Sequence, residues 1–400
     1  MKKMGKKIAI VARLLADRSG GAERIACELA NYLDEGGYEV TVLHFDKSNK
    51  PPFFPMSPNV QLINLYGHNT LTKKQRWGRL IKNLPFVPKN IREKAQWNFS
   101  HDFFMSQLRN YFLFNETEVA ISFLPSANTP ALLATEGLSV KVVATNHNVP
   151  EQDYLSPQRW DPNPLDRELR LKVLDRAAAI HVLSEEFSSW FPPHLANRIR
   201  VIPNYVSHQF TSGQDINVKK DNIIMAAGRL ASVKNYIDLI NAWKILAPEF
   251  PDWQVKLFGT GPLQNTLQRK ILELDIEDTF SLQGQKNDLY EEYLHSSIFC
   301  HPAIHEGFGL VAAEAMALGT PVVFYGDCPG VNSFVKSGYN GLAADRNLGP
   351  GDLADKLRYL MRESEERKRL GANAQNSVQN FSVEKYKQTW FKLIDSLIRD

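Results

Sequence analysis

The sequence predicts an α/β protein with two doubly wound parallel sheets in tandem, and three observations lead to this fold class. Short β-branched runs alternate with longer segments of helical periodicity. The runs are continuously apolar, which is typical of parallel strands covered on both faces. The pattern then restarts after a stretch rich in Pro, Asn, Ser and Gly near the middle of the chain. A chain of 400 residues is long enough for about two domains, each with its own core.

The first series of elements fills the N-terminal half. Its expected strands are KIAIVAR at 7–13, EVTVLHF at 39–45, VAISFL at 119–124, KVVATN at 141–146, AAIHVL at 178–183 and RIRVIPN at 198–204. A helix is expected from the turn after the first strand to about Leu33. This alternation predicts a Rossmann-like domain.

The second series repeats the arrangement. Its expected strands are IIMAAGR at 223–229, WQVKLFG at 253–259, TFSLQG at 279–284, IFCHPA at 298–303 and PVVFYG at 321–326, with helices from about 235, near 263–274 and near 287–297. The stretch 201–222 between the two series has no apolar periodicity and is the expected linker.

We therefore expect two tandem Rossmann-like, doubly wound domains at 1–207 and 208–380, and a final amphipathic helix at 381–400. Open α/β sheets bind ligands at the carboxyl ends of their strands. The expected ligand site is thus a cleft that the two domains face.

Composition excludes several classes of protein. Cys27, Cys300 and Cys328 fit neither a disulfide framework nor a zinc site, as expected in a reducing cytosol. The N-terminus resembles a signal peptide, but Arg13 interrupts its apolar run, and no stretch approaches the roughly 20 apolar residues of a membrane span. We expect a cytoplasmic protein.

Glycine turns follow two of the expected strands. Gly20 and Gly21 precede the first helix, and Gly259 and Gly261 lie in FGTGP after the strand at 253–259. Such turns let backbone N–H groups approach a ligand at the start of a helix. The alternative is a tight turn alone. The first turn lacks the full spacing of a dinucleotide fingerprint, which disfavours NAD.

Charged residues follow two other strands. Arg229 and Lys234 flank the loop after the strand at 223–229, where two cations suit a diphosphate; a solvated loop is the alternative. Glu306 and Glu314 lie eight positions apart, about 80° off a common helical face. If a helix begins near Gly309, both glutamates border its N-terminus, and each is suited to accept hydrogen bonds from ligand hydroxyls. Glu314 alternatively complements the helix dipole.

His147 follows the expected strand at 141–146 and is flanked by two asparagines. A neutral imidazole there can hydrogen-bond a sugar hydroxyl. A histidine that only satisfies a turn is the alternative.

The ordered set of motifs resembles the large glycosyltransferase family 4-like group of retaining, two-Rossmann-domain (GT-B) enzymes that use nucleotide sugars. The motifs are GGAER at 20–24, NHN at 146–148, IPN at 202–204, GRLxxxK at 228–234, GTGP at 259–262 and E-x(7)-E at 306–314 followed by AMALGTPVV. The resemblance covers most of the chain.

The resemblance implies a role for each motif. Arg229 and Lys234 would bind the donor diphosphate, Glu314 the ribose and Glu306 the donor sugar. The backbone from Phe308 through Gly309 to Leu310 would meet phosphate or sugar, Gly21 would lie over the diphosphate, and His147 would lie beside the transferred sugar. The domain at 1–207 would bind the acceptor, the domain at 208–380 would bind the nucleotide sugar, and the final helix would cross back to the first domain.

One segment departs from the family pattern. Many relatives read GG-x-x-E after PVV, whereas this chain has YGDCPGVNSFV with Asn332 in place of an acidic residue. Asp327 in this segment is either polar lining or an ordinary loop residue. The resemblance therefore implies no donor contact for Asn332.

The chain contains no D-x-D motif and no His/Cys cluster, so we expect no bound metal and no cofactor beyond the donor. Basic side chains and the helix dipole would then neutralise the charge of the leaving diphosphate. A front-face route needs only these positive groups, which we call the cationic cradle. A double displacement also needs a nucleophile, which the sequence does not place.

A basic segment suggests how an acceptor is presented. Residues 71–94 carry eight Lys and Arg against one Glu, and Trp77, Leu80, Ile81 and Leu84 recur at helical spacing. The helix at 73–84, with Lys73, Lys74, Arg76, Arg79 and Lys82, either lies on an anionic membrane or docks its apolar stripe on its own domain. No nucleic-acid-binding module surrounds it.

The sequence thus predicts a metal-independent glycosyltransferase that moves a hexose or N-acetylhexosamine, with UDP the first choice of nucleotide and GDP open, to a glycan or lipid-linked acceptor of the cell envelope. Two alternatives remain. A nucleotide-sugar epimerase or hydrolase would consume donor without acceptor, and a two-lobed solute-binding protein would leave Arg229 and Lys234 unexplained.

Overall fold

The computed structural model describes residues 5–67, 73–81, 84, 86–211, 218–286 and 288–399. The chain forms two compact units. Unit 1 consists of Met1–Pro203 together with Lys387–Asp400, and unit 2 consists of Asn204–Tyr386. The domain limits expected from the sequence, at residues 207 and 380, stay predictions.

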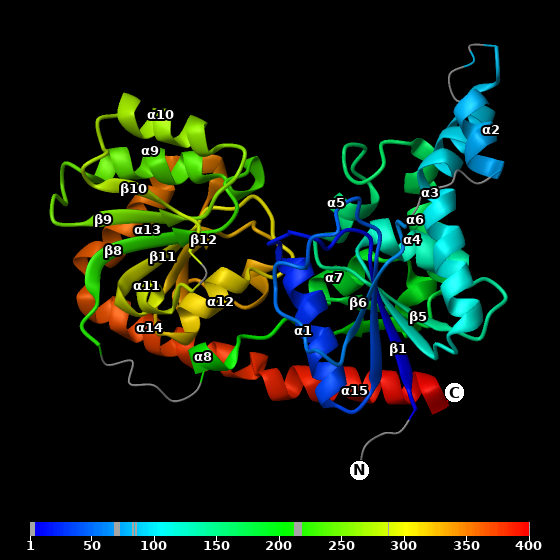
Figure 1. Ribbon diagram of the computed structural model, residues 1–400. Coiled ribbons are helices and arrows are strands. Elements are labelled where there is room, and N and C mark those ends of the chain that lie inside the picture. The colour runs from blue at the N-terminus through cyan, green and yellow to red at the C-terminus, as the bar shows by residue number, and fades with distance from the viewer. Residues whose placement is uncertain are drawn as a thin grey trace. The chain divides into compact units, whose positions relative to one another are not determined.

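Unit 1 is built on a parallel sheet with the strand order β3-β2-β1-β4-β5-β6-β7 (Figure 1). The strands are β1 (Lys7–Ala12), β2 (Glu39–His44), β3 (Gln61–Asn64), β4 (Val119–Phe123), β5 (Lys141–Thr145), β6 (Ala179–Val182) and β7 (Ile199–Val201). The chain order runs outward in both directions from the centre, so the topological switch point lies between β1 and β4. Ala12 and Phe123 are register partners there, and Phe123 pairs with Thr145 on β5.

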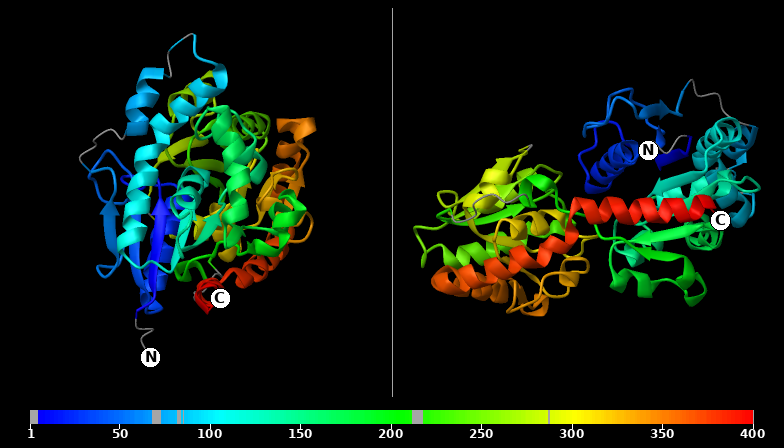
Figure 2. Two further views of the ribbon diagram at one scale, coloured as in Figure 1. Left: turned by 90° about the vertical axis from the view of Figure 1, so that its right-hand side faces the viewer. Right: turned by 90° about the horizontal axis from the view of Figure 1, so that it is seen from below.

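Helices pack around this sheet. They are α1 (Gly21–Glu35), α2 (Lys73–Ile81), α3 (Lys89–Phe114), α4 (Pro125–Ala134), α5 (Pro150–Tyr154), α6 (Pro164–Lys172) and α7 (Glu185–Trp190). The last helix, α15 (Val383–Arg399), also packs on unit 1 and is red in Figure 2. Its Trp390 is fully buried with the ring 5.1 Å from His181, and Tyr38 donates a hydrogen bond to Asp395 at 2.8 Å.

Unit 2 repeats the architecture with the strand order β10-β9-β8-β11-β12-β13 (Figure 1). The strands are β8 (Asp221–Ala227), β9 (Gln254–Phe258), β10 (Phe280–Gly284), β11 (Ser296–His301), β12 (Val322–Tyr325) and β13 (Gly341–Ala344). The helices are α8 (His208–Thr211), α9 (Tyr236–Leu246), α10 (Gln264–Glu273), α11 (Tyr290–His295), α12 (Leu310–Ala317), α13 (Pro350–Arg362) and α14 (Ser364–Val378). Its core gathers around the fully buried Trp243 of α9, and its switch point lies between β8 and β11.

The predicted fold class is confirmed, because both units are parallel α/β sheets covered by helices. Two edge strands, β3 and β13, were not predicted. The helix expected near 287–297 is shorter within the described residues, since α11 ends at His295 and Ser296 begins β11. Residues 212–217 of the expected linker lie outside the described residues.

The basic segment forms α2, which lies against the N-terminal half of α3 (Figure 2). The contact is made by Gly78, where a side chain would overlap the Ala95 carbonyl oxygen, and by Gln75, whose amide donates to the Phe99 carbonyl at 2.9 Å. Trp77 and Leu80 remain 65% and 64% exposed. The alternative that this apolar stripe docks on its own domain is therefore wrong for these two side chains.

Lys82 lies outside the described residues, as does the side chain of Lys74. None of the helices in the described ranges combines the length and the apolar character that crossing a membrane requires.

Candidate active site

The strand order of unit 2 brings two loops with predicted site residues together. β8 and β11 are neighbours in the sheet, with Met225 and Phe299 as register partners. The loop after β8 carries Arg229 and Lys234, and the loop after β11 carries Glu306. Both loops leave the carboxyl ends of adjacent strands at the switch point, which is where open α/β sheets bind ligands.

Lys234 and Glu306 form an ion pair. The Lys234 ammonium contacts Glu306 Oε1, and each side chain is 17% exposed. His301, the last residue of β11, places its Nε2 3.4 Å from the same carboxylate oxygen. This cluster joins the ends of the two central strands of unit 2.

Electrostatics keeps the Glu306 carboxylate ionised. Burial raises the pKa of Glu306, but the charge of Lys234 and the contact with His301 lower it by more. The net result is a pKa well below the ordinary value for Glu. A depressed carboxyl pKa means that the negative charge persists until the pH falls below the ordinary range for Glu. Burial lowers the pKa of His301, so its imidazole is neutral at pH 7. Glu306 therefore only accepts hydrogen bonds.

Arg229 is exposed, in contrast to Lys234. The turn that carries it is packed closely on the loop after β9. A side chain at Gly259 would overlap the Gly228 carbonyl oxygen, and one at Gly261 would lie 2.5 Å from the Leu230 carbonyl oxygen. Both glycines thus have a packing role here, and their expected contact with a donor stays a prediction.

The E-x(7)-E motif at 306–314 spans a helix N-terminus, as expected. Gly309 is the N-cap of α12 with φ +90°, in the left-handed region that favours glycine. Ala312 and Ala313 donate to the Gly309 carbonyl at 2.9 and 3.1 Å, and no side chain caps the helix. The backbone N–H groups of Leu310 and its neighbour thus begin the helix at its positive end.

Two further residues of the motif are buried. The Phe308 ring packs between Phe334 and Phe381 at 5.1 and 5.2 Å, so only its backbone is suited to contact a ligand. Glu314 is 6% exposed and accepts a hydrogen bond from the Tyr293 hydroxyl at 3.1 Å. Its expected contact with a ribose stays a prediction.

The segment that departs from the family pattern has its own partners. Asp327 pairs with Arg346 at 2.9 Å, and the guanidinium of Arg346 stacks on the Tyr325 ring at 4.1 Å. The amide oxygen of Asn332 is buried and has no hydrogen-bond partner among the described residues.

In unit 1, His147 follows the end of β5 and stacks on Phe123 with ring centroids 4.7 Å apart. Its Nε2 lies 3.0 Å from the Thr145 hydroxyl. That hydroxyl donates its own proton to the Ser122 carbonyl at 2.8 Å, so it accepts from His147. His147 therefore carries its proton on Nε2, and Nδ1 is an unprotonated acceptor.

The acceptor atom of His147 is buried and available. His147 is 8% exposed, and its Nδ1 has no hydrogen-bond partner among the described residues. Burial and the nearby His181 lower its pKa well below the ordinary value, so the ring is neutral at pH 7. A neutral imidazole with a free lone pair can accept a hydrogen bond from a ligand hydroxyl.

The other predicted residues of unit 1 lie at the start of α1. Gly20 is its N-cap, and a side chain there would overlap the Glu23 carboxylate, which folds back over the turn. Gly21 is the first residue of the helix and is exposed. Their expected contact with a diphosphate stays a prediction.

The predicted residues thus fall into two sets: one gathered at the β8 and β11 loops of unit 2, the other at the β1 and β5 loops of unit 1. Sequence reasoning missed His301 and Thr145, each the final residue of a strand. A polar residue at the end of an otherwise apolar run was the available signal. Within the described ranges, no group of three or more His, Cys, Asp or Glu side chains could hold a metal ion.

Family models match nearly the whole chain. A model described as Glycosyltransferase Family 4 matches residues 19–210, and one described as Glycosyl transferases group 1 matches residues 209–377. An uncharacterized glycosyltransferase of Haemophilus influenzae is 26% identical over 374 residues, covering 93% of this chain and 95% of that protein.

Two further proteins are similar along their full length. The Campylobacter jejuni GalNAc-α-(1→4)-GalNAc-α-(1→3)-diNAcBac-PP-undecaprenol α-1,4-N-acetyl-D-galactosaminyltransferase is 23% identical over 391 residues, covering 97% of this chain and 98% of the enzyme. The pneumococcal O-GlcNAc transferase GtfA, solved with UDP and GlcNAc, superposes with a TM-score of 0.75 at 14% identity over 99% of each chain. At this identity the structural likeness concerns the fold.

Proposed function

Because this chain belongs to the glycosyltransferase family 4-like enzymes with the GT-B fold, we propose that it transfers a hexosyl or N-acetylhexosaminyl group from a UDP-sugar to a glycan or lipid-linked acceptor, with retention of configuration. The observation that carries this proposal is the Lys234, Glu306 and His301 cluster at the carboxyl ends of β8 and β11. UDP is the first choice because the similar O-GlcNAc transferase was solved with UDP.

The diphosphate is held by positive charge from this chain. Lys234, Arg229 and the positive end of α12 supply it, and the phosphate replaces Glu306 as the partner of the Lys234 ammonium. Glu306, which stays anionic, then accepts hydrogen bonds from two hydroxyls of the donor sugar. Glu314 binds the ribose, and the backbone from Phe308 to Leu310 meets the phosphate. No metal ion is needed for this neutralisation.

Transfer proceeds on one face of the sugar. The bond from the anomeric carbon to the diphosphate oxygen breaks, the acceptor oxygen bonds to that carbon, and its proton passes to the departing phosphate. This route needs no enzyme nucleophile, and the Glu306 carboxylate instead accepts hydrogen bonds from hydroxyls of the donor sugar. The cationic cradle stabilises the leaving group, an electrostatic effect that usually dominates catalysis. His147 Nδ1 accepts a hydrogen bond from the transferred sugar.

The acceptor is presented in the cytoplasm at the inner face of a membrane. The Campylobacter jejuni relative is named for an acceptor linked through PP to undecaprenol. The exposed Trp77 and Leu80 on the basic helix α2 support the same presentation here.

The experiment that tests the proposal has two parts. Differential scanning fluorimetry with UDP-, GDP- and ADP-sugars reports the donor, because a ligand that binds the native state raises the Tm. We expect UDP-sugars to give the largest shift, with or without EDTA. In a transfer assay, Lys234→Ala should lower kcat by about 100- to 1,000-fold, the effect of removing one preorganised donor.

Two controls make the result decisive. Lys336→Ala removes a lysine of unit 2 outside the cluster, and its kcat should match the native value. Donor cleavage at the same rate with and without acceptor would identify a hydrolase instead, and a Lys234→Ala enzyme of native kcat would remove this cluster from the site.

A further inference from the structure

Unit 1 contains a cavity of about 290 Å³ at its own topological switch point. Ala12 and Arg13 at the end of β1 and Phe123 and Leu124 at the end of β4 form its base. The volume lies just below the roughly 300–1,000 Å³ typical of small-molecule sites. The cavity therefore suits a ligand of one ring rather than a polymer segment.

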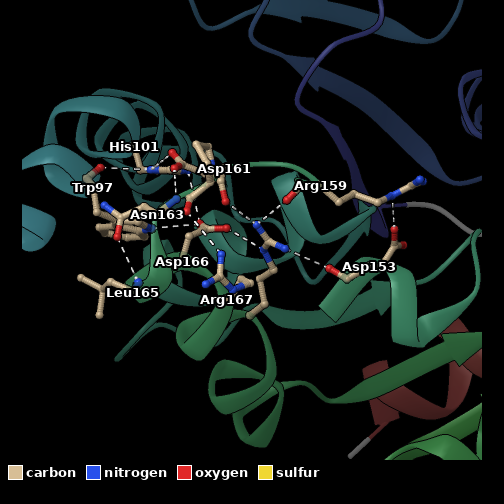
Figure 3. Close-up of polar contacts among 11 residues, drawn as sticks. Trp97, His101, Asp153, Arg159, Asp161, Asn163, Leu165, Asp166 and Arg167 are labelled. Carbon is tan, nitrogen blue, oxygen red and sulfur yellow. Dashed lines mark hydrogen bonds and ion pairs between the residues drawn. The ribbon is translucent and has the colours of Figure 1, made fainter. Parts of the chain in front are cut away.

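Three residues of the lining, His101, Asp161 and Asp166, belong to a charge network whose polar contacts Figure 3 draws. Asp166 accepts hydrogen bonds from Trp97 Nε1 at 2.9 Å and from Arg170 Nε at 2.6 Å. Arg170 is 1% exposed and donates three more N–H groups to the carbonyls of Asp153, Arg159 and Asp161. One guanidinium thus bonds to three carbonyl groups of the segment 153–161. Moving this segment would be costly, because the buried N–H groups of Arg170 would lose their partners.

One carboxylate oxygen of Asp161 has no hydrogen bond among the described residues. Asp161 Oδ1 accepts from the Asn163 backbone at 2.9 Å, whereas Oδ2 lies 3.8 Å from His101 Nδ1, in a long ion-pair contact. That nitrogen already donates to the Trp97 carbonyl at 3.0 Å. In Figure 3 His101 and Asp161 lie side by side, and at 3.8 Å their contact is longer than a hydrogen bond. Asp161 lines the cavity, so Oδ2 is an acceptor for a ligand.

Arg13 supplies donors in the same cavity. Among the described residues its guanidinium donates to the Ser100 carbonyl at 3.1 Å, which uses one of its five N–H groups. Its charge is offset by Asp161, while the Asp166 charge is paired with Arg170. The other two charged residues of the lining, Arg18 and Glu23, are of opposite sign. The lining is therefore close to neutral.

Aromatic and apolar side chains complete the lining. Trp160 and Phe123 face the cavity together with Pro130 and Pro162. Apolar walls with a few fixed polar groups are typical of sites that bind one orientation of a small ligand. A lining of balanced charge does not attract an anion. The Asp161 carboxylate accepts hydrogen bonds, so it favours a ligand with hydroxyl groups.

We propose that this cavity binds the terminal sugar of the acceptor, and that the sugar is an uncharged pyranose whose hydroxyls donate to Asp161 Oδ2 and accept from Arg13. This assignment rests on the proposed function and names the substrate class on its acceptor side. Asp161 is the specificity-determining residue, because a uronate would bring a second carboxylate against it. Trp160 provides the apolar surface under the ring.

Ligand binding to the full chain tests the assignment without a donor. The probes are the methyl glycosides of glucose, galactose, N-acetylglucosamine and N-acetylgalactosamine, with methyl glucuronide as the charged comparison, in saturation-transfer NMR titrations. At least one neutral glycoside should bind, and the glucuronide should not. Asp161→Asn should weaken binding at least about tenfold, as expected for hydrogen bonds to a charged acceptor.

Two variants guard the interpretation. Asp175→Asn changes an exposed aspartate of unit 1 outside the cavity and should bind like the native chain. Ala22→Phe fills the cavity without touching the charge network and should abolish binding, with a Tm close to native.

Three results would overturn the assignment: no glycoside binds, the glucuronide binds as tightly as the neutral sugars, or Asp161→Asn and Ala22→Phe leave the affinity unchanged. A Tm shift with UDP-sugars alongside any of these leaves the proposed function standing. Absence of transfer with every donor would instead remove the proposed function.

Discussion

A hydroxyl two residues before His147 decides the chemistry of that ring. The Thr145 hydroxyl accepts a hydrogen bond from His147 Nε2–H, because it donates its own proton in a hydrogen bond to the Ser122 carbonyl. Ser122 and Asn128 brace this arrangement, since the Ser122 hydroxyl donates to Asn128 Oδ1 and the Asn128 amide donates to the Thr145 carbonyl. Thr145 is thus a positioning residue that keeps Nδ1 free to accept.

We predict that Thr145→Val lowers kcat/KM about tenfold, because it removes one buried hydrogen bond of about 1 to 1.5 kcal/mol that orients the ring. Thr145→Ser keeps the hydroxyl and should restore activity. ¹⁵N NMR of the histidine ring should show unprotonated Nδ1 in the native and Ser chains and a changed tautomer signal in the Val chain. A Val chain with native kinetics and native ¹⁵N shifts would contradict this role.

The sequence predicted the residue types of the candidate site better than their pairing. The assignment of Lys234 to the diphosphate and of Glu306 to the donor sugar stays a prediction. In the structure the two side chains form one ion pair with His301 beside them, which the sequence did not indicate. Their separation of 72 residues hides this contact. It depends on β8 and β11 being neighbours, which is a property of the sheet order rather than of either loop.

At the scale of elements, apolar runs predicted the central strands and missed one edge strand of each sheet, β3 and β13. β8 and β11 carry long buried runs, whereas β3 is exposed or half-buried along its length and β13 is partly so. Edge strands bury fewer side chains, so their composition resembles that of loops. Periodicity also predicted that Trp77 and Leu80 share a face of α2. The face that packs against α3, however, is formed by Gln75 and Gly78, and Trp77 and Leu80 are exposed.

The start of α12 depends on the backbone of Gly309. Its φ is +90°, and a Cβ there would lie 2.8 Å from Val331 Cγ2. Gly338 has a similar φ of +77° but open space around it. Alanine at Gly338 therefore tests backbone strain alone, whereas alanine at Gly309 tests strain together with steric overlap with Val331.

We predict that Gly338→Ala costs about 1–2 kcal/mol from the left-handed conformation alone. Gly309→Ala should cost about 1–3 kcal/mol more, because the methyl group displaces Val331. In calorimetry the Tm of Gly309→Ala should then lie at least about 2 °C below that of Gly338→Ala. The Gly309 variant should also bind UDP-sugars more weakly, since the first turn of α12 moves. Equal Tm and equal donor affinity would show that the helix start tolerates a side chain.

At the scale of the whole molecule, exposed apolar side chains gather on one short stretch. Trp77, Leu80, Leu84 and Phe86 are 65%, 64%, 47% and 97% exposed within ten residues. Lys73, Arg76 and Arg79 are exposed on α2, the helix that also carries Trp77 and Leu80. Another exposed apolar pair, Leu113 and Phe114 at the end of α3, is followed by Glu116 and Glu118 instead of basic residues.

We predict from this contrast that α2 makes the proposed contact with a membrane. An amphipathic helix with a basic polar face binds anionic lipid through buried apolar area together with charge attraction. The native chain should therefore sediment with vesicles containing phosphatidylglycerol and less with pure phosphatidylcholine, and 0.5 M salt should weaken the binding, because salt screens surface charge. The double variant Trp77→Gln and Leu80→Gln should bind at least about tenfold more weakly.

The matched variant Leu113→Gln and Phe114→Gln removes the same kind of exposed apolar area without a basic surround, so its vesicle binding should equal that of the native chain. All four side chains are exposed, and neither change should lower the Tm, which separates lipid contact from folding. If the two double variants lose binding equally, general hydrophobicity drives the association. If neither loses it, the membrane contact does not involve α2.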